Sequence, residues 1–147
     1  MIYTVLAATS LFLMSCANNT AEQMVLAPKA FKEAIDKNAA APVIDVRTAE
    51  EFNNGHIEKA VNIDYNSADF ETKIAAYPKD EPIYIYCQGG SRSAGAALKM
   101  KELGFTKVYD MQGGMVAYNS EFAPKDAPAA NGEMTMADFE KMIDKDK

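Results

Sequence analysis

The sequence predicts an α/β domain in which a mainly parallel sheet carries helices on both faces. Short apolar, β-branched runs recur along the chain and alternate with segments that carry helix start and stop signals. This repeated strand–helix–strand order favours a parallel sheet with helices on both sides. With 147 residues, 48% of them hydrophobic and 24% charged, the chain is long enough for one such core and too short for two full domains.

Four short runs are predicted as strands. They span residues 43–46, 61–63, 83–86 and 108–111 and are rich in Val, Ile and Tyr, which favour strands. Ligands of such sheets bind beyond the carboxyl ends of the strands. Cys87, which directly follows the third run, therefore falls at a predicted ligand-binding edge.

A short helix is predicted after the first strand. Thr48 and Glu51 form a capping-box pattern, in which the hydroxyl and the carboxylate satisfy free backbone N–H groups. The helix is therefore expected to begin there and to end near Asn54 and Gly55.

Two further helices are expected between the later strands. One spans 67–77 and is stopped by Pro78, and the other spans 91–103 and is closed by Gly104, in the position that tolerates a left-handed cap. The second helix carries an apolar stripe that predicts core packing: Ala96, Ala97, Met100 and Leu103.

The N-terminal segment 1–16 is predicted as a signal peptide that precedes a domain spanning 24–123. Its apolar run is followed by a polar stretch and is shorter than the roughly twenty apolar residues that a membrane span needs. It ends in Leu13-Met14-Ser15-Cys16, which resembles the lipobox of bacterial lipoproteins, with Cys16 as the lipidated residue. The chain is then expected on the periplasmic or outer-surface side of a bacterial envelope, anchored to the membrane by lipid. The alternatives are an ordinary cleaved signal and an N-terminal helix with a buried cysteine.

The C-terminal segment 124–147 is predicted as a linker followed by an amphipathic helix. Ala, Pro, Asp and Lys dominate the linker. The helix is expected to begin near Thr135 and to have one apolar side, and its sequence is similar to that of residues 26–37. It is expected to pack on the domain or to dock a partner.

Composition argues against several classes of function. The formal net charge is -6 and basic residues are interspersed with acids, so no nucleic-acid partner is predicted. One histidine and two cysteines, Cys16 and Cys87, leave no cluster with metal-ligand spacing. We expect no metal, no organic cofactor and no disulfide between these two cysteines, which lie in very different surroundings.

The segment Cys87-Gln88-Gly89-Gly90-Ser91-Arg92 has the composition of an anion-binding loop. Two glycines let successive N–H groups point inward, the following helix presents its positive end, and Arg92 adds a charge with a fork of donors. Such surroundings stabilise a thiolate, so Cys87 is predicted to be a nucleophile. The structural alternative is a buried cysteine beside a tight turn.

The loop resembles the active loop of the rhodanese family of sulfurtransferases, in the common form C-x-x-G-x-R, and the chain is similar to the single-domain thiosulfate sulfurtransferases. The likeness continues in Val43-Ile44-Asp45-Val46-Arg47, Glu51-Phe52, Gly55-His56-Ile57 and Ala60-Val61-Asn62-Ile63, and downstream in Val108-Tyr109-Asp110-Met111-Gln112-Gly113-Gly114-Met115. Several ordered motifs are more specific than any single one.

The resemblance implies that Cys87 takes sulfane sulfur from a donor such as thiosulfate, holds it as a persulfide and passes it to cyanide, a thiol or a protein acceptor. The substrate-binding residues that it implies are Gln88, Gly89, Gly90, Ser91 and Arg92. A structural role is implied for Asp45, Arg47, Glu51 and His56, which fasten the strand to the next helix and turn.

Two other functions stay open. A cysteine phosphatase or related arsenate reductase also places Cys in an anion cradle closed by Arg, but five residues separate the two in such phosphatases and four do here. A non-enzymatic domain that relays sulfur or binds a partner is the second alternative.

Overall fold

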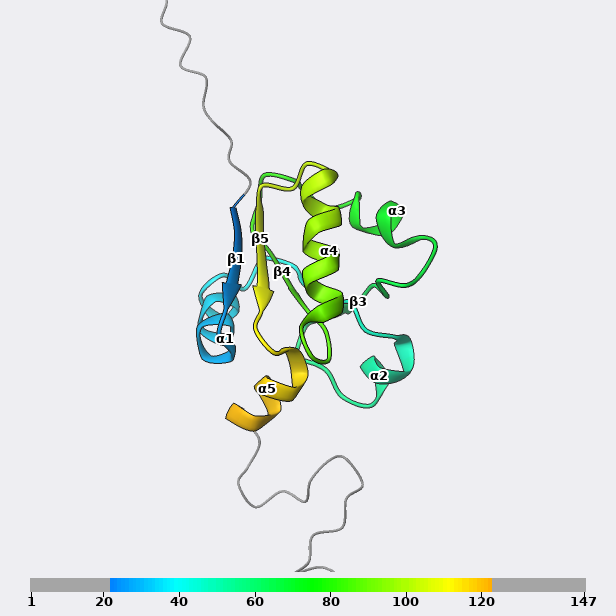
Figure 1. Ribbon diagram of the computed structural model, residues 1–147. Helices are drawn as coiled ribbons and strands as arrows, with labels where there is room; N and C mark the ends of the chain where they lie inside the picture. Colours follow the sequence, from blue (N-terminus) through cyan, green and yellow to red (C-terminus); the bar gives the residue numbers. More distant parts are fainter. Residues whose placement is uncertain (1–21, 123–147) are drawn as a thin grey trace, which may run out of the picture.

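A computed structural model describes residues 22–122, which form a five-stranded sheet with five helices around it (Figure 1). The elements are β1 (Glu22–Leu26), α1 (Pro28–Lys37), β2 (Val43–Asp45), α2 (Ala49–Asn53), β3 (Val61–Asn62), α3 (Phe70–Ile74), β4 (Ile83–Tyr86), α4 (Ser91–Glu102), β5 (Lys107–Met111) and α5 (Gly114–Phe122). The predicted signal segment 1–16, with Cys16, and the tail 124–147 lie outside the described residues. In the described part of the chain, no helix is long and apolar enough to cross a membrane.

The strands lie in the order β1-β5-β4-β2-β3, and each neighbouring pair is parallel. Their carboxyl ends therefore point to one edge of the sheet, where α2, the first turn of α4 and α5 come together (Figure 1). The α/β fold predicted from the sequence is confirmed. β4 lies in the centre, with all four residues buried, and it delivers Cys87 to this edge.

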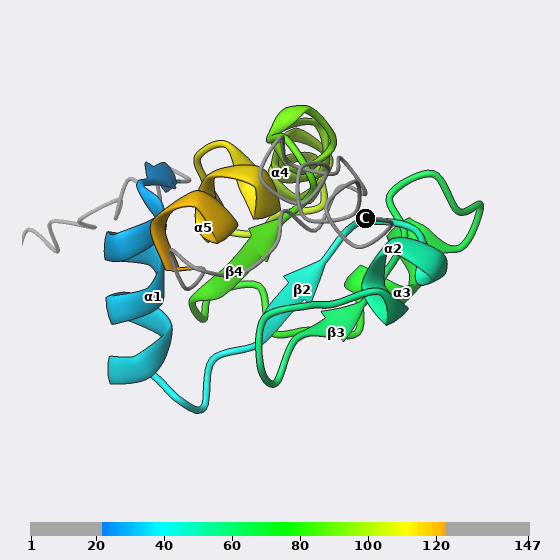
Figure 2. The same ribbon diagram turned by 90° about the horizontal axis from the view of Figure 1, so that it is seen from below.

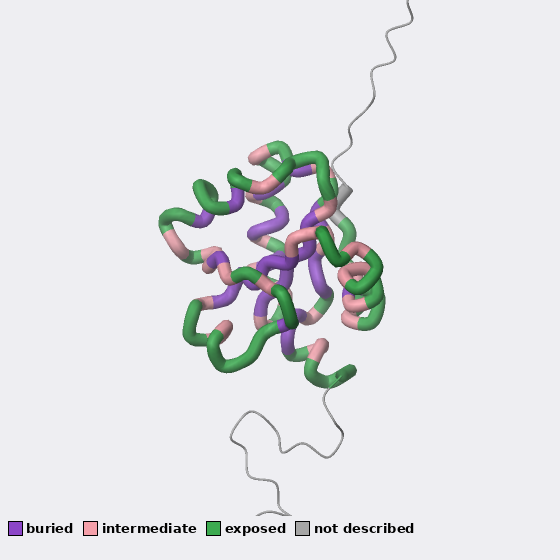
Figure 3. The backbone as a smooth tube through the Cα atoms, turned by 180° about the vertical axis from the view of Figure 1, so that it is seen from behind, coloured by how far each residue is buried: buried purple, intermediate pink, exposed green. Residues whose placement is uncertain are grey.

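Helices cover both faces of the sheet, as the alternation of side chains on β4 requires. Ile83 and Ile85 join a cluster with α3 and α4, whereas Tyr84 and Tyr86 join a cluster with α1 and α5. Figure 2 shows α1 and α4 on opposite sides of the sheet. Buried residues follow the central strands, and the exposed ones form the outer loops and helix surfaces (Figure 3). Full burial of one such apolar side chain stabilises the fold by about 1.5–3 kcal/mol.

The helix signals at Thr48 and Gly104 are confirmed. The Thr48 hydroxyl accepts the N–H of Glu51, and the Glu51 carboxylate accepts the N–H of Thr48 at 3.0 Å. At the end of α4, Gly104 has φ +94°, and the N–H of Phe105 donates to the carbonyl of Met100. This left-handed closure satisfies carbonyls that the end of a helix otherwise leaves without partners.

Four elements differ from the sequence prediction, and one of them is α1, which was not predicted as a helix. The helix expected over 67–77 is only α3, because Asp64 accepts the N–H groups of Asn66 and Ser67 and holds the chain in turns before Phe70. β1 was not predicted as a strand, and the segment after the Gly113-Gly114 turn was not predicted as the helix α5.

Candidate active site at the Cys87 loop

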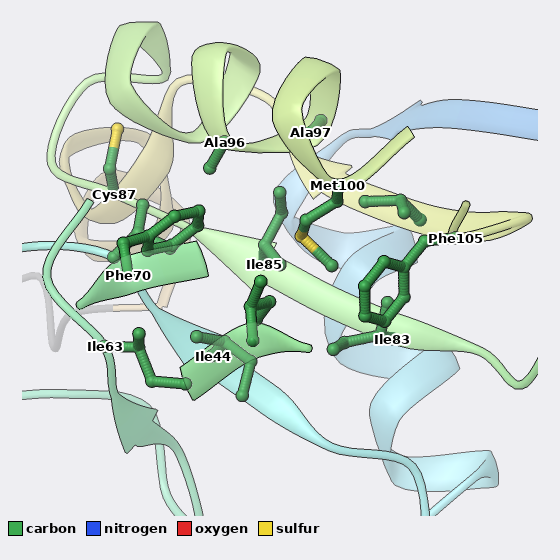
Figure 4. Packing of buried hydrophobic residues seen from close by; sticks show 13 residues of the cluster. Ile44, Ile63, Phe70, Ile83, Ile85, Cys87, Ala96, Ala97, Met100 and Phe105 are labelled. Carbon is green, nitrogen blue, oxygen red and sulfur yellow. The ribbon is translucent and has the colours of Figure 1, made fainter. Parts of the chain in front are cut away.

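Cys87 lies between the end of β4 and the first turn of α4. Gly90 is the N-cap of α4 with φ +100°, a left-handed conformation that favours glycine, and its N–H donates to Cys87 Sγ at 3.0 Å. Cys87 is buried, with 1% of its surface exposed. Figure 4 shows Cys87 at one end of the core cluster, with its sulfur beside the first turn of α4.

A second turn holds the backbone of this loop in place. The N–H of Met115 donates to the Cys87 carbonyl at 2.8 Å, and the N–H of Val116 donates to the Gln88 carbonyl at 3.0 Å. This close approach needs glycine at position 114, where φ is +56° and a Cβ would collide with the Cys87 carbonyl oxygen. The first turn of α5 therefore fixes the loop, a role that the sequence did not reveal.

Hydrogen-bond donors favour the thiolate of Cys87. Burial alone would raise its pKa, but the Ser93 hydroxyl and the N–H groups of Ser93, Gly90 and Gly89 outweigh burial and lower the pKa. Ser93 was missing from the site predicted from sequence, although it directly follows Arg92 in the first turn of α4. Its full burial gives it a defined position under the loop.

Arg92 and Glu51 bring two separate sequence motifs together. The Arg92 guanidinium makes two contacts of 2.7 Å with the Glu51 carboxylate, one from each terminal nitrogen. These bonds, together with those from Thr48, lower the pKa of Glu51 to about 2 despite partial burial. Each terminal nitrogen of Arg92 thus makes one bond to Glu51. The substrate-binding role that the resemblance implies for Arg92 stays a prediction.

Asp45 and Arg47 form a buried pair beneath the loop. Arg47 Nε lies 3.0 Å from both carboxylate oxygens of Asp45, and a terminal nitrogen lies 2.6 Å from Oδ2. The guanidinium also donates to the Gly55 carbonyl at 2.6 Å and to the Gln88 side chain at 3.1 Å. It therefore links β2, the turn after α2 and the Cys87 loop.

His56 and Ser91 lie at the surface. The His56 ring is stacked on Phe52 at 3.8 Å between centroids, and its Nδ1 lies 3.0 Å from the Phe52 carbonyl. These contacts belong to the helix–turn unit rather than to the thiol. Ser91 is exposed at the start of α4.

A cleft of about 560 Å³ opens beside Gln88. Its lining comes from the β2–α2 region, the Cys87 loop and α5 and includes Arg47, His56, Gln88, Tyr118 and Asn119. The lining is mixed in polarity. Among residues 22–122, His, Cys, Asp and Glu form no group of three that could hold a metal ion.

The rhodanese-like domain family model matches residues 27–121. This match covers well over half of the chain, so the protein belongs to the rhodanese-like domain family. The Cys87 loop lies within the matched residues.

Known relatives agree with this assignment. The thiosulfate sulfurtransferase GlpE of Stutzerimonas stutzeri is 38% identical over 79 residues, which cover 53% of this chain and 70% of GlpE. The Mycobacterium tuberculosis protein named "Probable adenylyltransferase/sulfurtransferase MoeZ" is 30% identical over 108 residues, which cover 74% of this chain but only 28% of MoeZ. A rhodanese-related protein of Thermoplasma volcanium has a crystal structure with a TM-score of 0.59 and 27% identity, covering 69% of this chain and 95% of that one. These relatives support a sulfur-transfer enzyme class.

Proposed function

We propose that the protein is a sulfurtransferase that moves sulfane sulfur from a donor such as thiosulfate to a thiophilic acceptor through a persulfide on Cys87. The observation that carries this proposal is the position of Cys87 Sγ, which accepts the Gly90 N–H at 3.0 Å within a set of donors that lowers the pKa of the thiol. A thiolate held in this way is the nucleophile that sulfur transfer requires.

The chemistry needs no oxidant from outside. The thiolate attacks the outer sulfur of thiosulfate, so that a Cys–S–S⁻ persulfide forms and the S–S bond to sulfite breaks. Sulfite leaves with the electron pair. Cyanide then attacks the outer sulfur of the persulfide, thiocyanate leaves, and the Cys87 thiolate is restored. A thiolate acceptor takes the sulfur in the same manner.

The loop suits a persulfide better than a large anion. Neutral N–H groups at the start of α4 and the positive end of its helix dipole surround Cys87 and stabilise negative charge there. Cys87 itself is 1% exposed, so little water reaches the residue.

The test is thiosulfate:cyanide sulfurtransferase activity of the full chain, with its intact mass measured after exposure to thiosulfate. Cys87→Ser is the test variant and Cys16→Ser the matched control, because it removes the other cysteine and leaves the loop intact. We expect one added sulfur atom and thiocyanate production in the wild type and in Cys16→Ser, and neither in Cys87→Ser.

Other results would favour the alternatives. Added sulfur without turnover to cyanide or small thiols would favour a relay to a protein acceptor. Absence of added sulfur with every sulfane donor, together with hydrolysis of a phosphate monoester, would favour a phosphatase and contradict the proposal.

We also propose that the chain is exported and lipidated at Cys16, because of its lipobox-like sequence. Incorporation of labelled palmitate in a bacterial host, lost in Cys16→Ser and retained in Cys87→Ser, is the expected result. Equal labelling of both variants, or of neither, would contradict this proposal.

A further inference from the structure

The cleft beside Gln88 is larger than the small sulfur compounds of the proposed reaction require. Its volume of about 560 Å³ lies in the range of sites that bind small organic ligands. Thiosulfate and cyanide consist of only a few atoms each and would leave most of this space empty. Transfer of sulfur between such compounds therefore does not explain the cleft.

The cleft borders the Cys87 loop directly. It lies at the carboxyl edge of the sheet, where α2, the loop and α5 come together (Figure 1). The loop contributes Gln88, the residue that follows Cys87, and α5 contributes Met115, whose N–H donates to the Cys87 carbonyl at 2.8 Å. Two lining residues are thus joined to Cys87, one through the chain and the other through a hydrogen bond.

The charged groups that line the cleft have partners of opposite charge. A terminal nitrogen of Arg47 lies 2.6 Å from the Asp45 carboxylate, and the Glu51 carboxylate accepts from Arg92 at 2.7 Å. Charges balanced in this way give a small ion little net attraction. The other polar lining residues offer amide, hydroxyl and imidazole groups: Asn54, His56, Gln88, Tyr118 and Asn119. These groups match the neutral donors and acceptors of a ligand that carries amides.

Arg47 sets the orientation of the Gln88 side chain. It donates to Gln88 Oε1 at 3.1 Å and is itself held by the buried Asp45 and by the Gly55 carbonyl at 2.6 Å. Because Oε1 bonds the guanidinium, the N–H groups of the same amide are the donors that Gln88 offers to a ligand. A buried ion pair therefore fixes one polar group of the cleft in place.

The lining favours the acceptor of sulfur over its donor. A donor has to bring its sulfur to Cys87 Sγ, which accepts the Gly90 N–H at 3.0 Å. None of the residues 89–92, which continue the loop around Sγ, is among the lining residues of the cleft. An acceptor meets only the outer sulfur of the persulfide, which stands about 2 Å beyond Sγ because of the S–S bond. The acceptor thus has to reach less far than the donor.

We propose that this cleft binds the organic part of a small thiol acceptor that carries amide groups, and that Gln88 and Asn119 determine this specificity. The inference rests on the proposed sulfurtransferase function and names the substrate class of its second step. The acceptor thiolate attacks the outer sulfur of the Cys87 persulfide and forms a new S–S bond. The old S–S bond breaks, and its electron pair returns to Cys87 Sγ, so that no oxidant is needed.

The test compares two thiols as acceptors. The parent is the full chain carrying Cys16→Ser, so that Cys87 is the only cysteine. N-acetylcysteine methylamide has an amide on either side of its thiol-bearing carbon chain, whereas 2-mercaptoethanol has none. Sulfite release at saturating thiosulfate measures turnover with either thiol. The readout is the ratio of kcat/KM for the amide thiol to kcat/KM for 2-mercaptoethanol, in which changes in the reactivity of Cys87 itself cancel.

Asn119→Leu is the test variant, because leucine keeps the size of this exposed side chain and removes its hydrogen-bonding groups. Loss of one neutral hydrogen bond is expected to lower the ratio by about threefold to tenfold, through a higher KM for the amide thiol. Gln88→Leu is expected to lower the same ratio. Asn53→Leu is the matched control, since Asn53 is exposed at the end of α2 and does not line the cleft, and its ratio should equal that of the parent.

Two outcomes would overturn the inference. Equal ratios in Asn119→Leu, Gln88→Leu and Asn53→Leu would show that the cleft does not recognise the acceptor. A higher KM for thiosulfate in Asn119→Leu, measured with cyanide and accompanied by an unchanged thiol ratio, would assign the cleft to the donor.

Turnover of the parent with thiosulfate and cyanide tests the proposed function separately. Its absence would contradict the sulfurtransferase activity itself. Turnover with cyanide together with an unchanged thiol ratio would contradict only the acceptor cleft.

Discussion

The Arg92 guanidinium donates two hydrogen bonds to the Glu51 carboxylate, each with a nitrogen–oxygen distance of 2.7 Å. Glu51 comes from the capping box of α2 and Arg92 from the end of the Cys87 loop, so the pair ties the loop to a helix far away in sequence. Because the charge of Arg92 is balanced by Glu51, the donors that favour the Cys87 thiolate are mainly neutral N–H and O–H groups.

Glu51→Gln is expected to destabilise the fold. The amide cannot match both guanidinium contacts, and charged hydrogen bonds of this kind contribute about 1–3 kcal/mol. Urea unfolding at neutral pH measures the loss. Glu50→Gln is the matched control, because Glu50 is an exposed neighbour on the same helix. Equal unfolding midpoints for the two variants would show that the ion pair adds no stability.

The Glu51–Arg92 pair also makes the stability of the fold depend on pH in the acid range. The pKa of Glu51 is about 2 in the folded chain against an ordinary value of 4.5, so its contribution is complete above about pH 5 and is lost as pH falls toward 2. The stability difference between wild type and Glu51→Gln should therefore shrink over this range. A constant difference down to about pH 2.5 would mean that the carboxylate is not held by Arg92.

Gly114→Ala is expected to disturb both stability and thiol reactivity. A methyl group there meets the Cys87 carbonyl oxygen and lies 2.7 Å from the Gln88 carbonyl oxygen, and φ of +56° is itself strained for alanine. We expect a loss of about 2–4 kcal/mol, typical of strain combined with steric overlap. Gly89→Ala, where nothing lies within 4 Å, is the control for stability. Similar urea midpoints for both variants would contradict this account.

Most of the fold follows from local patterns in the sequence. The central strands were predicted because their residues are apolar and fully buried, as in β4. β1 was missed because it is an edge strand whose Met24 and Val25 are exposed, so no buried pattern marks it. α5 was missed because it begins at Gly114, a residue type that usually interrupts a helix.

The site was predictable only where its residues are contiguous. Cys87, Gly90 and Arg92 belong to one loop whose composition indicates an anion cradle. Gly114 meets the Cys87 carbonyl only because the turn before α5 packs on the loop, and spacing in the chain does not reveal that contact. The engagement of Arg92 by Glu51 likewise depends on how α2 lies against the loop.

Asp45→Asn is expected to be among the most destabilising conservative changes in the domain. Asp45 is fully buried and Arg47 is 4% exposed, so removal of the carboxylate charge leaves a buried guanidinium without its counter-ion. Breaking such a pair costs about 3–5 kcal/mol. Asp36→Asn, which breaks the exposed pair of Asp36 with Lys32, is the control and should change the urea midpoint little. Comparable losses in the two variants would contradict the importance of burial.

Tyr86→Phe is expected to lower stability without changing the reactivity of the thiol. The Tyr86 ring is fully buried, and its hydroxyl accepts the N–H of Ile57 at 3.1 Å. Phenylalanine keeps the ring but leaves that buried N–H without an acceptor, at a cost of about 1–3 kcal/mol.

Tyr86 packs on the face of the sheet that carries α1 and α5. Cys87 belongs to the core cluster on the other face, with α3 and α4. Urea unfolding should therefore report the loss, while the pH profile of Cys87 alkylation should match that of the parent. A shifted alkylation profile would mean that the hydrogen bond to Ile57 also sets the end of β4, and with it the position of the thiol above the first turn of α4.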